Sequence, residues 1–241
     1  MKKLSFLIVL LSINVSANSI LIKSGQINDG LGNSFIGDIL IVDEKIVEVG
    51  KFLNSSSAKI IEAKGKPVTP GLISPISNIG VVEINALDVT NDDSPDFFGP
   101  GFSVFNAFNP HSTLIPWNRS NGVTSSISTP GYSSQIFKGM GSFYLLDGDI
   151  NITGNADVAM YARLGAIGGS RAETIQIMES MFELALNKDE LESEELLGTT
   201  FASSMDMQLQ DIQALSRVVN REIPLVLEVN RAIDILQALR L

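Results

Sequence analysis

The stretch that decides the fold is residues 65–78, which read GKPVTPGLISPISN. Before it, short β-branched runs follow one another closely, and after it, apolar runs alternate with longer segments that include helical patterns. Pro67 and Pro70 end the first pattern, because proline has no N–H to give to a strand ladder. We therefore expect two domains, covering residues 18–69 and 70–241.

The first domain is predicted to be a small β-sheet or half of a sandwich. Residues 38–42 and 46–50 flank a short charged turn, so they predict a hairpin. The spacing of all the runs is that of short strands joined by tight connections. The four predicted strands are residues 19–23, 38–42, 46–50 and 59–63.

The second domain is predicted to be α/β. The run at 223–229 is apolar apart from Glu228, which is typical of a strand buried on both faces of a parallel sheet. Apolar residues at helical spacing predict helices at 172–186, 206–220 and 231–241, and 111–120 has a short helical pattern. Strands are predicted within 72–84 and at 122–128, 142–146, 156–161 and 223–229, with a long loop at 85–109.

Composition excludes several kinds of site. The 241 residues include one histidine, His111, and no cysteine, which rules out disulfides, iron–sulfur clusters, thiolate zinc sites and multi-histidine metal sites within one chain. The net charge of −10 argues against nucleic acid as a partner, because binding phosphates requires a basic face.

Residues 1–17 are predicted to be a signal peptide. Lys2 and Lys3 precede an apolar run at 4–13, and Val15-Ser16-Ala17 has the small residues of a cleavage site. The apolar run is short for a membrane span, and no later segment is long and apolar enough for one. We expect a periplasmic or secreted bacterial protein without a membrane span after cleavage.

Four stretches carry a resemblance to a known family. Residues 46–50, 65–73, 122–124 and 223–235 resemble the amidohydrolase superfamily, and most closely its secreted, imidazolonepropionase-like branch. The resemblance implies a small composite β-sandwich that leads into a metal-dependent (β/α)8 barrel. It also implies hydrolysis of non-peptide C–N bonds, with a small cyclic amide or a related molecule as ligand and a divalent metal such as Zn²⁺ as cofactor.

The chain departs from the family at the metal ligands. Where the family has His-x-His on the first barrel strand, this chain has Ile76 and Asn78, and a later histidine is replaced by Glu228 or Asn230. An isoleucine cannot bind a metal, and an amide oxygen is a poor replacement for imidazole. Glu228 could bind a hard cation. Because the family's metal ligands are replaced here, we assign no cofactor to this chain.

The second departure is the length of the barrel region. A (β/α)8 barrel takes about 250 residues, and the region after residue 70 has five predicted strands. The expected fold is an incomplete amidohydrolase-type barrel preceded by part of a composite sandwich. Such a chain would expose strand edges and apolar helix faces, which favours self-association.

Five residues are candidates for the pocket: Asn78, Glu83, His111, Glu228 and Asn230. His111 could be a general base or a substrate contact, or a loop histidine at a helix start. Glu83 could direct a carboxylate into the pocket, or face solvent or an arginine.

Arg119 and Arg171 could bind a substrate carboxylate or tie loops to the body of the domain. Three hypotheses about function stay open. The first is an impaired or inactive C–N hydrolase, the second a non-catalytic periplasmic binding or interaction protein, and the third a truncated fragment of a longer amidohydrolase.

Overall fold

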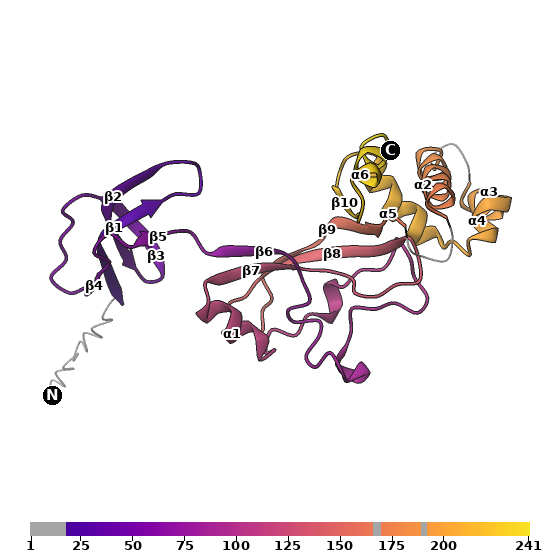
Figure 1. Ribbon diagram of the computed structural model, residues 1–241. Helices are drawn as coiled ribbons and strands as arrows, with labels where there is room; N and C mark the ends of the chain where they lie inside the picture. Colours follow the sequence, from indigo (N-terminus) through magenta and orange to yellow (C-terminus); the bar gives the residue numbers. More distant parts are fainter. Residues whose placement is uncertain (1–17, 166–169, 189–191) are drawn as a thin grey trace, which may run out of the picture. The chain divides into compact units, whose positions relative to one another are not determined.

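The computed structural model describes residues 18–165, 170–188 and 192–241 (Figure 1). The predicted signal peptide, residues 1–17, lies outside the described residues. The chain divides into two compact units, with the boundary between Pro70 and Gly71. Within the described residues, no helix has both the length and the apolar character needed to cross a membrane.

Unit 1 contains a five-stranded sheet. Its order is β3-β2-β1-β4, and β5 pairs with β1. β2 and β3 form the predicted antiparallel hairpin, while β4 and β5 run parallel to β1. The predicted strands are present and β1 is longer than expected, whereas the two-residue β5 was not predicted. The strands are β1 (Ser19–Asn28), β2 (Ser34–Val42), β3 (Lys45–Gly50), β4 (Lys59–Glu62) and β5 (Pro67–Val68).

Unit 2 is built on a second five-stranded sheet of order β10-β9-β8-β7-β6. All five predicted strands exist, although β8 begins earlier than expected. The sheet is mixed: β6 and β7 are parallel, as are β9 and β10, whereas β8 is antiparallel to both of its neighbours. The strands are β6 (Leu72–Ser77), β7 (Val123–Ser128), β8 (Phe137–Leu145), β9 (Gly154–Arg163) and β10 (Leu225–Glu228).

The expectation that every strand of the barrel region runs parallel to its neighbours is therefore wrong at β8. The connections from β7 to β8 and from β8 to β9 are short and contain no helix. Adjacent parallel strands need a crossover of a dozen or more residues, usually helical, whereas antiparallel neighbours need only a turn. Residues 129–136 and 146–153, which carry Pro130 and Gly148, can only reverse the chain.

The helices of unit 2 follow the predicted positions for the most part. α1, α2, α5 and α6 occupy predicted segments, and Ser170 caps α2 by accepting a hydrogen bond from the N–H of Glu173 at 3.1 Å. The short α3 and α4 and the 3-10 turns η1 (Asp88–Thr90) and η2 (Phe105–Ala107) were not predicted. The helices are α1 (Leu114–Ser120), α2 (Arg171–Leu186), α3 (Ser193–Gly198), α4 (Thr200–Ser204), α5 (Leu209–Val219) and α6 (Ala232–Ala238).

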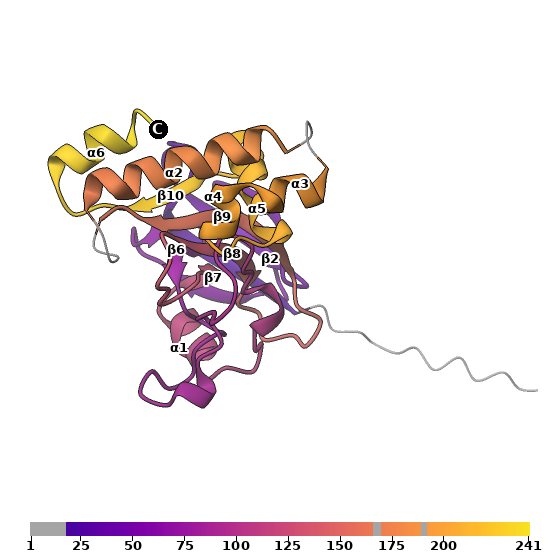
Figure 2. The same ribbon diagram turned by 90° about the vertical axis from the view of Figure 1, so that its right-hand side faces the viewer.

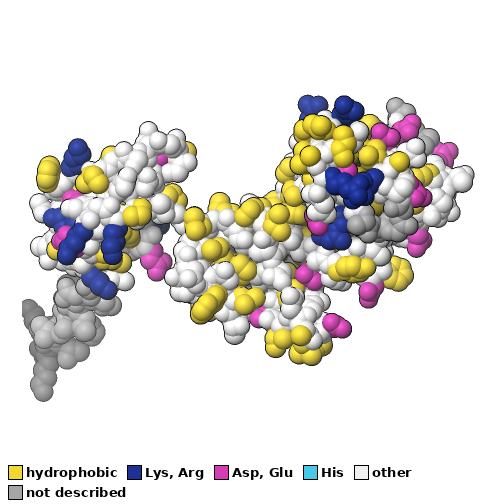
Figure 3. Space-filling model, viewed as in Figure 1, with side chains coloured by type: hydrophobic (Ala, Val, Ile, Leu, Met, Phe, Trp, Pro, Cys, Tyr) yellow, Lys and Arg dark blue, Asp and Glu magenta, His cyan; other side chains and the backbone are white. Residues whose placement is uncertain are grey.

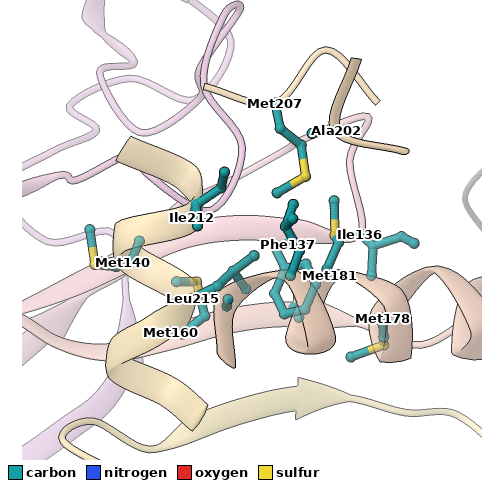
Figure 4. Packing of buried hydrophobic residues seen from close by; sticks show 14 of the residues in the cluster. Ile136, Phe137, Met140, Met160, Met178, Met181, Ala202, Met207, Ile212 and Leu215 are labelled. Atoms are coloured by element: carbon teal, nitrogen blue, oxygen red, sulfur yellow. The ribbon is translucent and has the colours of Figure 1, made fainter. Parts of the chain in front are cut away.

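The main core of unit 2 lies between its sheet and the helices α2 and α5, which cover one face of β8 and β9 (Figures 1 and 2). Phe137 of β8 and Met160 of β9 are fully buried against Met178 of α2 and Leu215 of α5 (Figure 4). Burying a side chain of this size contributes about 1.5–3 kcal/mol. Since side chains alternate along a strand, the residues that follow Phe137 and Met160 in sequence, Lys138 and Tyr161, point to the opposite face of the sheet.

A smaller cluster anchors the predicted long loop to the sheet. Tyr144 of β8 is fully buried and stacks on Phe108, with ring centroids 3.9 Å apart. Its hydroxyl donates a hydrogen bond to the carbonyl oxygen of Phe105 at 2.9 Å. The loop is thus packed onto the sheet by its aromatic residues.

Apolar side chains are also exposed on both units (Figure 3). They include Ile46, Val47 and Val49 of β3 in unit 1, and Leu72, Ile73 and Ile76 of β6 in unit 2. Of these, Ile76 adjoins the cavity described next.

Candidate functional site

A cavity of about 260 Å³ lies in unit 2, on the sheet face opposite α2 and α5. The carboxyl ends of β6, β9 and β10 meet the start of β8 there, which is where open and closed α/β sheets carry their ligand sites. Nine residues line it: Ile76, Thr129, Pro130, Lys138, Tyr161, Ala162, Val226, Leu227 and Glu228.

Tyr161 shows that the sheet curls around this cavity. Its hydroxyl donates a hydrogen bond to the carbonyl oxygen of Pro75 at 3.0 Å. Tyr161 belongs to β9 and Pro75 to β6, and two other strands lie between them in the sheet order. A flat sheet could not bring these residues together, so the five strands form a curled half-barrel. Burial raises the pKa of Tyr161, so its phenol is a neutral wall of the cavity.

Three charged side chains meet at the edge of the cavity. Glu228 and Arg163 are paired across the parallel strands β10 and β9. The Oε2 atom of Glu228 lies 3.1 Å from Nε of Arg163 and 3.4 Å from Nζ of Lys138. The side chains of Lys138 and Arg163 are 16% and 26% exposed, and that of Glu228 is 47% exposed.

The two cations keep Glu228 ionised. Burial by itself raises the pKa of the carboxyl, but the hydrogen bond and charge of Arg163, together with the charge of Lys138, outweigh it and lower the pKa below its ordinary value. Glu228 is therefore a carboxylate at neutral pH and cannot serve as a general acid there.

The five predicted pocket residues do not come together. Glu228 lines the cavity, whereas Asn78 and Asn230 do not. Asn78 is half-buried in a turn, where its carbonyl oxygen accepts the N–H groups of Val81 and Val82. Asn230 is exposed just after β10.

Glu83 and His111 belong to a separate cluster in the loop before α1. Glu83 accepts hydrogen bonds from Nδ2 of Asn109 at 3.0 Å and Oγ of Ser112 at 2.9 Å. His111 is exposed, and its backbone N–H donates to Oδ1 of Asn109 at 3.0 Å. These contacts tie the loop to the turn after β6, and neither residue lines the cavity.

The two arginines considered for a substrate carboxylate also make structural contacts. Arg119 donates to the carbonyl oxygens of Leu146 and Asp147 after β8. The Nε atom of Arg171, at the start of α2, lies 3.0 Å from Oδ2 of the buried Asp234 in α6. Each arginine joins two segments of the fold.

The cavity does not suit the divalent metal that the sequence resemblance implies. The described residues contain no group of three or more His, Asp or Glu side chains able to hold a metal ion. The wall carries the apolar Ile76, and its one carboxylate, Glu228, is already paired with Lys138 and Arg163. A metal ion here would meet two cations and too few oxygen ligands.

Lys138 and Arg163 were missed at the level of sequence. Lys138 is the one charged residue of β8, in a run that reads FKGMGSFYL, and Arg163 ends the apolar part of β9. A charged residue inside an otherwise apolar strand is the feature of the sequence that indicates such a site. It can be interpreted only once it is known which face of the strand is covered by helices.

Known proteins show two kinds of similarity to this chain, and no protein-family model matches it. A stretch of 57 residues is 47% identical to a 5-methylthioadenosine/S-adenosylhomocysteine deaminase of Thermococcus onnurineus, and 56 residues are 43% identical to a dihydroorotase of Lactococcus lactis. Each match covers 23% of this chain and 13% of the relative's length.

The structural likeness is more extensive. An amidohydrolase from Thermotoga maritima superposes with a TM-score of 0.70 over 92% of this chain and 61% of its own, at 23% sequence identity. At that identity the likeness establishes the fold. This chain therefore has an amidohydrolase-type fold and spans about three-fifths of that protein's length.

Proposed function

We propose that the protein is an amidohydrolase-like hydrolase that acts on a non-peptide C–N bond of a small molecule in the cavity beside Glu228. The observation that carries this proposal is the amidohydrolase-type fold over 92% of the chain. The stretches similar to a deaminase and a dihydroorotase support it. The cavity lies where such a fold holds its ligand, at the carboxyl ends of strands.

Within this proposal Glu228 is the acceptor for the substrate. Its Oε2 is shared by two cations, while Oε1 has no hydrogen-bond donor among the described residues. Since the carboxylate stays ionised, Oε1 can accept the N–H of an amide or ureide group.

The test is an assay of the purified protein with 5-methylthioadenosine, S-adenosylhomocysteine and dihydroorotate, each with and without added Zn²⁺ or Mn²⁺. We expect turnover that is lost in Glu228→Ala and kept in Glu222→Gln. Glu222 is an exposed carboxylate that pairs weakly with Arg217 and lies outside the cavity. Turnover that survives in Glu228→Ala would place the activity elsewhere, and absence of turnover on a broad panel of amides would contradict the proposal.

A second candidate is a non-catalytic small-molecule binding protein. It is favoured by Ile76 in the cavity wall and by the ammonium of Lys138 beside the one carboxylate. Such a protein would be stabilised by a ligand that it never turns over. A stoichiometric, tightly held metal in the purified protein would count against it.

We also propose that the protein belongs to the secreted, imidazolonepropionase-like branch and resides in the periplasm. The support is the lysine-initiated apolar segment at residues 1–17 and the sequence resemblance. Cell fractionation should find the protein in the periplasm with Asn18 as its first residue. Deletion of residues 2–17 should leave it in the cytoplasm.

A further inference from the structure

The edge of the cavity, where Arg163 lies just outside the lining, holds more positive than negative charge. Lys138 and Arg163 both lie within ion-pair distance of the same carboxylate oxygen of Glu228. Two cations facing one carboxylate leave a local surplus of one positive charge, in a chain whose net charge is −10. The rest of the lining is largely apolar and offers no second carboxylate.

Lys138 has donors to spare. Its side chain is 16% exposed, and among the described residues Oε2 of Glu228 is its one hydrogen-bond acceptor, at a long 3.4 Å. An ammonium carries three N–H donors. A largely buried cation with unused donors is costly unless an oxygen completes its shell. Because Lys138 lines the cavity, a bound ligand can supply that oxygen.

The size and walls of the cavity limit what that ligand can be. A volume of about 260 Å³ is below the roughly 300–1,000 Å³ of pockets that hold drug-sized ligands. Ile76, Pro130 and Val226 offer apolar contacts around the ammonium. A single negative charge balances the surplus, whereas a phosphate dianion would exceed it and would need more donors than one ammonium gives.

We propose that the cavity binds a short aliphatic carboxylate, with its oxygens on the ammonium of Lys138 and its chain against the apolar wall. Resting on the proposed hydrolase function, this assigns the substrate class as small C–N compounds that carry a carboxylate. Through Oε2, Glu228 then competes with the ligand for that ammonium, while its Oε1 keeps the acceptor role proposed above.

The probe is butyrate, with the neutral, similarly shaped butyramide as its counterpart, titrated calorimetrically into the full chain at constant ionic strength. We expect butyrate to bind and butyramide to bind at least tenfold more weakly. Lys138→Met should weaken butyrate binding about tenfold or more, because hydrogen bonds to charged groups are among the stronger ones. Arg240→Met removes the same charge at an exposed site outside the cavity and should leave binding unchanged.

Glu228→Gln separates this proposal from a general loss of structure. The substitution releases Lys138 from its ion pair, so butyrate should bind several-fold more tightly, a change that unfolding cannot produce. Equal binding of butyrate and butyramide, or unchanged binding in Lys138→Met, would overturn the inference. If amides are hydrolysed but butyrate does not bind, the inference fails and the hydrolase function stands. If butyrate binds through Lys138 but no amide is hydrolysed, the inference stands and the hydrolase function fails.

Discussion

Asp211 of α5 accepts a hydrogen bond from the backbone N–H of Gly101 at 2.7 Å, although 110 residues separate the two in sequence. Its other carboxylate oxygen accepts the N–H of Gln208 at 2.9 Å, which completes a capping box at the start of α5. Asp211 is only 3% exposed. One carboxylate therefore begins the helix that covers the sheet and fixes the long loop before α1.

We expect Asp211→Ala to lower the free energy of unfolding of unit 2 by about 2–4 kcal/mol, because it removes a cap and leaves a buried N–H without an acceptor. Urea unfolding followed by circular dichroism measures this change. Gln213→Ala, at an exposed position of the same helix, should change stability by no more than about 0.5 kcal/mol. Equal effects of the two substitutions would contradict the role assigned to Asp211.

Glu228 predicts a pH dependence of stability. Its folded-state pKa is lower than the ordinary 4.5, so the ion pair stabilises the fold fully above that value. The stabilisation is lost as pH falls through the lower, folded-state pKa. The difference in Tm between wild type and Glu228→Gln should stay constant around neutrality and narrow below pH 4.5.

The three tyrosines should titrate differently in the folded protein. Tyr132 is 73% exposed, whereas burial raises the pKa of both Tyr144 and Tyr161. Phenolate absorbance should therefore show Tyr144 and Tyr161 ionising only above the ordinary pKa of 10.0. Since the buried phenols have raised folded-state pKa values, the stability they give is complete below pH 10 and declines above it. Tyr161→Phe should remove part of the late transition, and its full persistence would contradict the assignment.

Gly139 predicts a steric requirement in β8. Its φ of +120° disfavours other residues, and a Cβ there would lie 2.6 Å from the carbonyl oxygen of Phe102. Gly122 has a φ of +88° with nothing within 4 Å of its Cβ position, so it isolates the backbone cost. We expect Gly122→Ala to cost about 1–3 kcal/mol and Gly139→Ala about 1–3 kcal/mol more. Chemical denaturation of both variants measures the difference.

The strands were easier to predict from sequence than their directions. Runs such as 223–229 are apolar and β-branched, so their positions in the fold followed from composition. The direction of β8 depends on the length and content of its two connections. The (β/α)8 barrel that the resemblance implies has only parallel strands, so it predicts the wrong direction for β8. α3 and α4 are only six and five residues long, too short for a clear helical period.

The site could be predicted only in part, because it is assembled across strands. Glu228 is a candidate from sequence because the family resemblance places a histidine at that point of the later strand. Its contacts with Lys138 and Arg163 depend on strand order and register, which a single sequence does not display. Glu83 looked equally suitable, but it follows β6 in a turn that faces Asn109 and Ser112.

The antiparallel course of β7, β8 and β9 also bears on how unit 2 folds. These three strands are consecutive in sequence and pair with their immediate neighbours, so their contacts close short loops. The pairs β6–β7 and β9–β10 close much longer ones, with a greater entropic cost before any contact is gained. We expect the central three-stranded meander to form first and to provide the template onto which the two outer strands are added last, with Glu228 of β10 completing the charged cluster at that step.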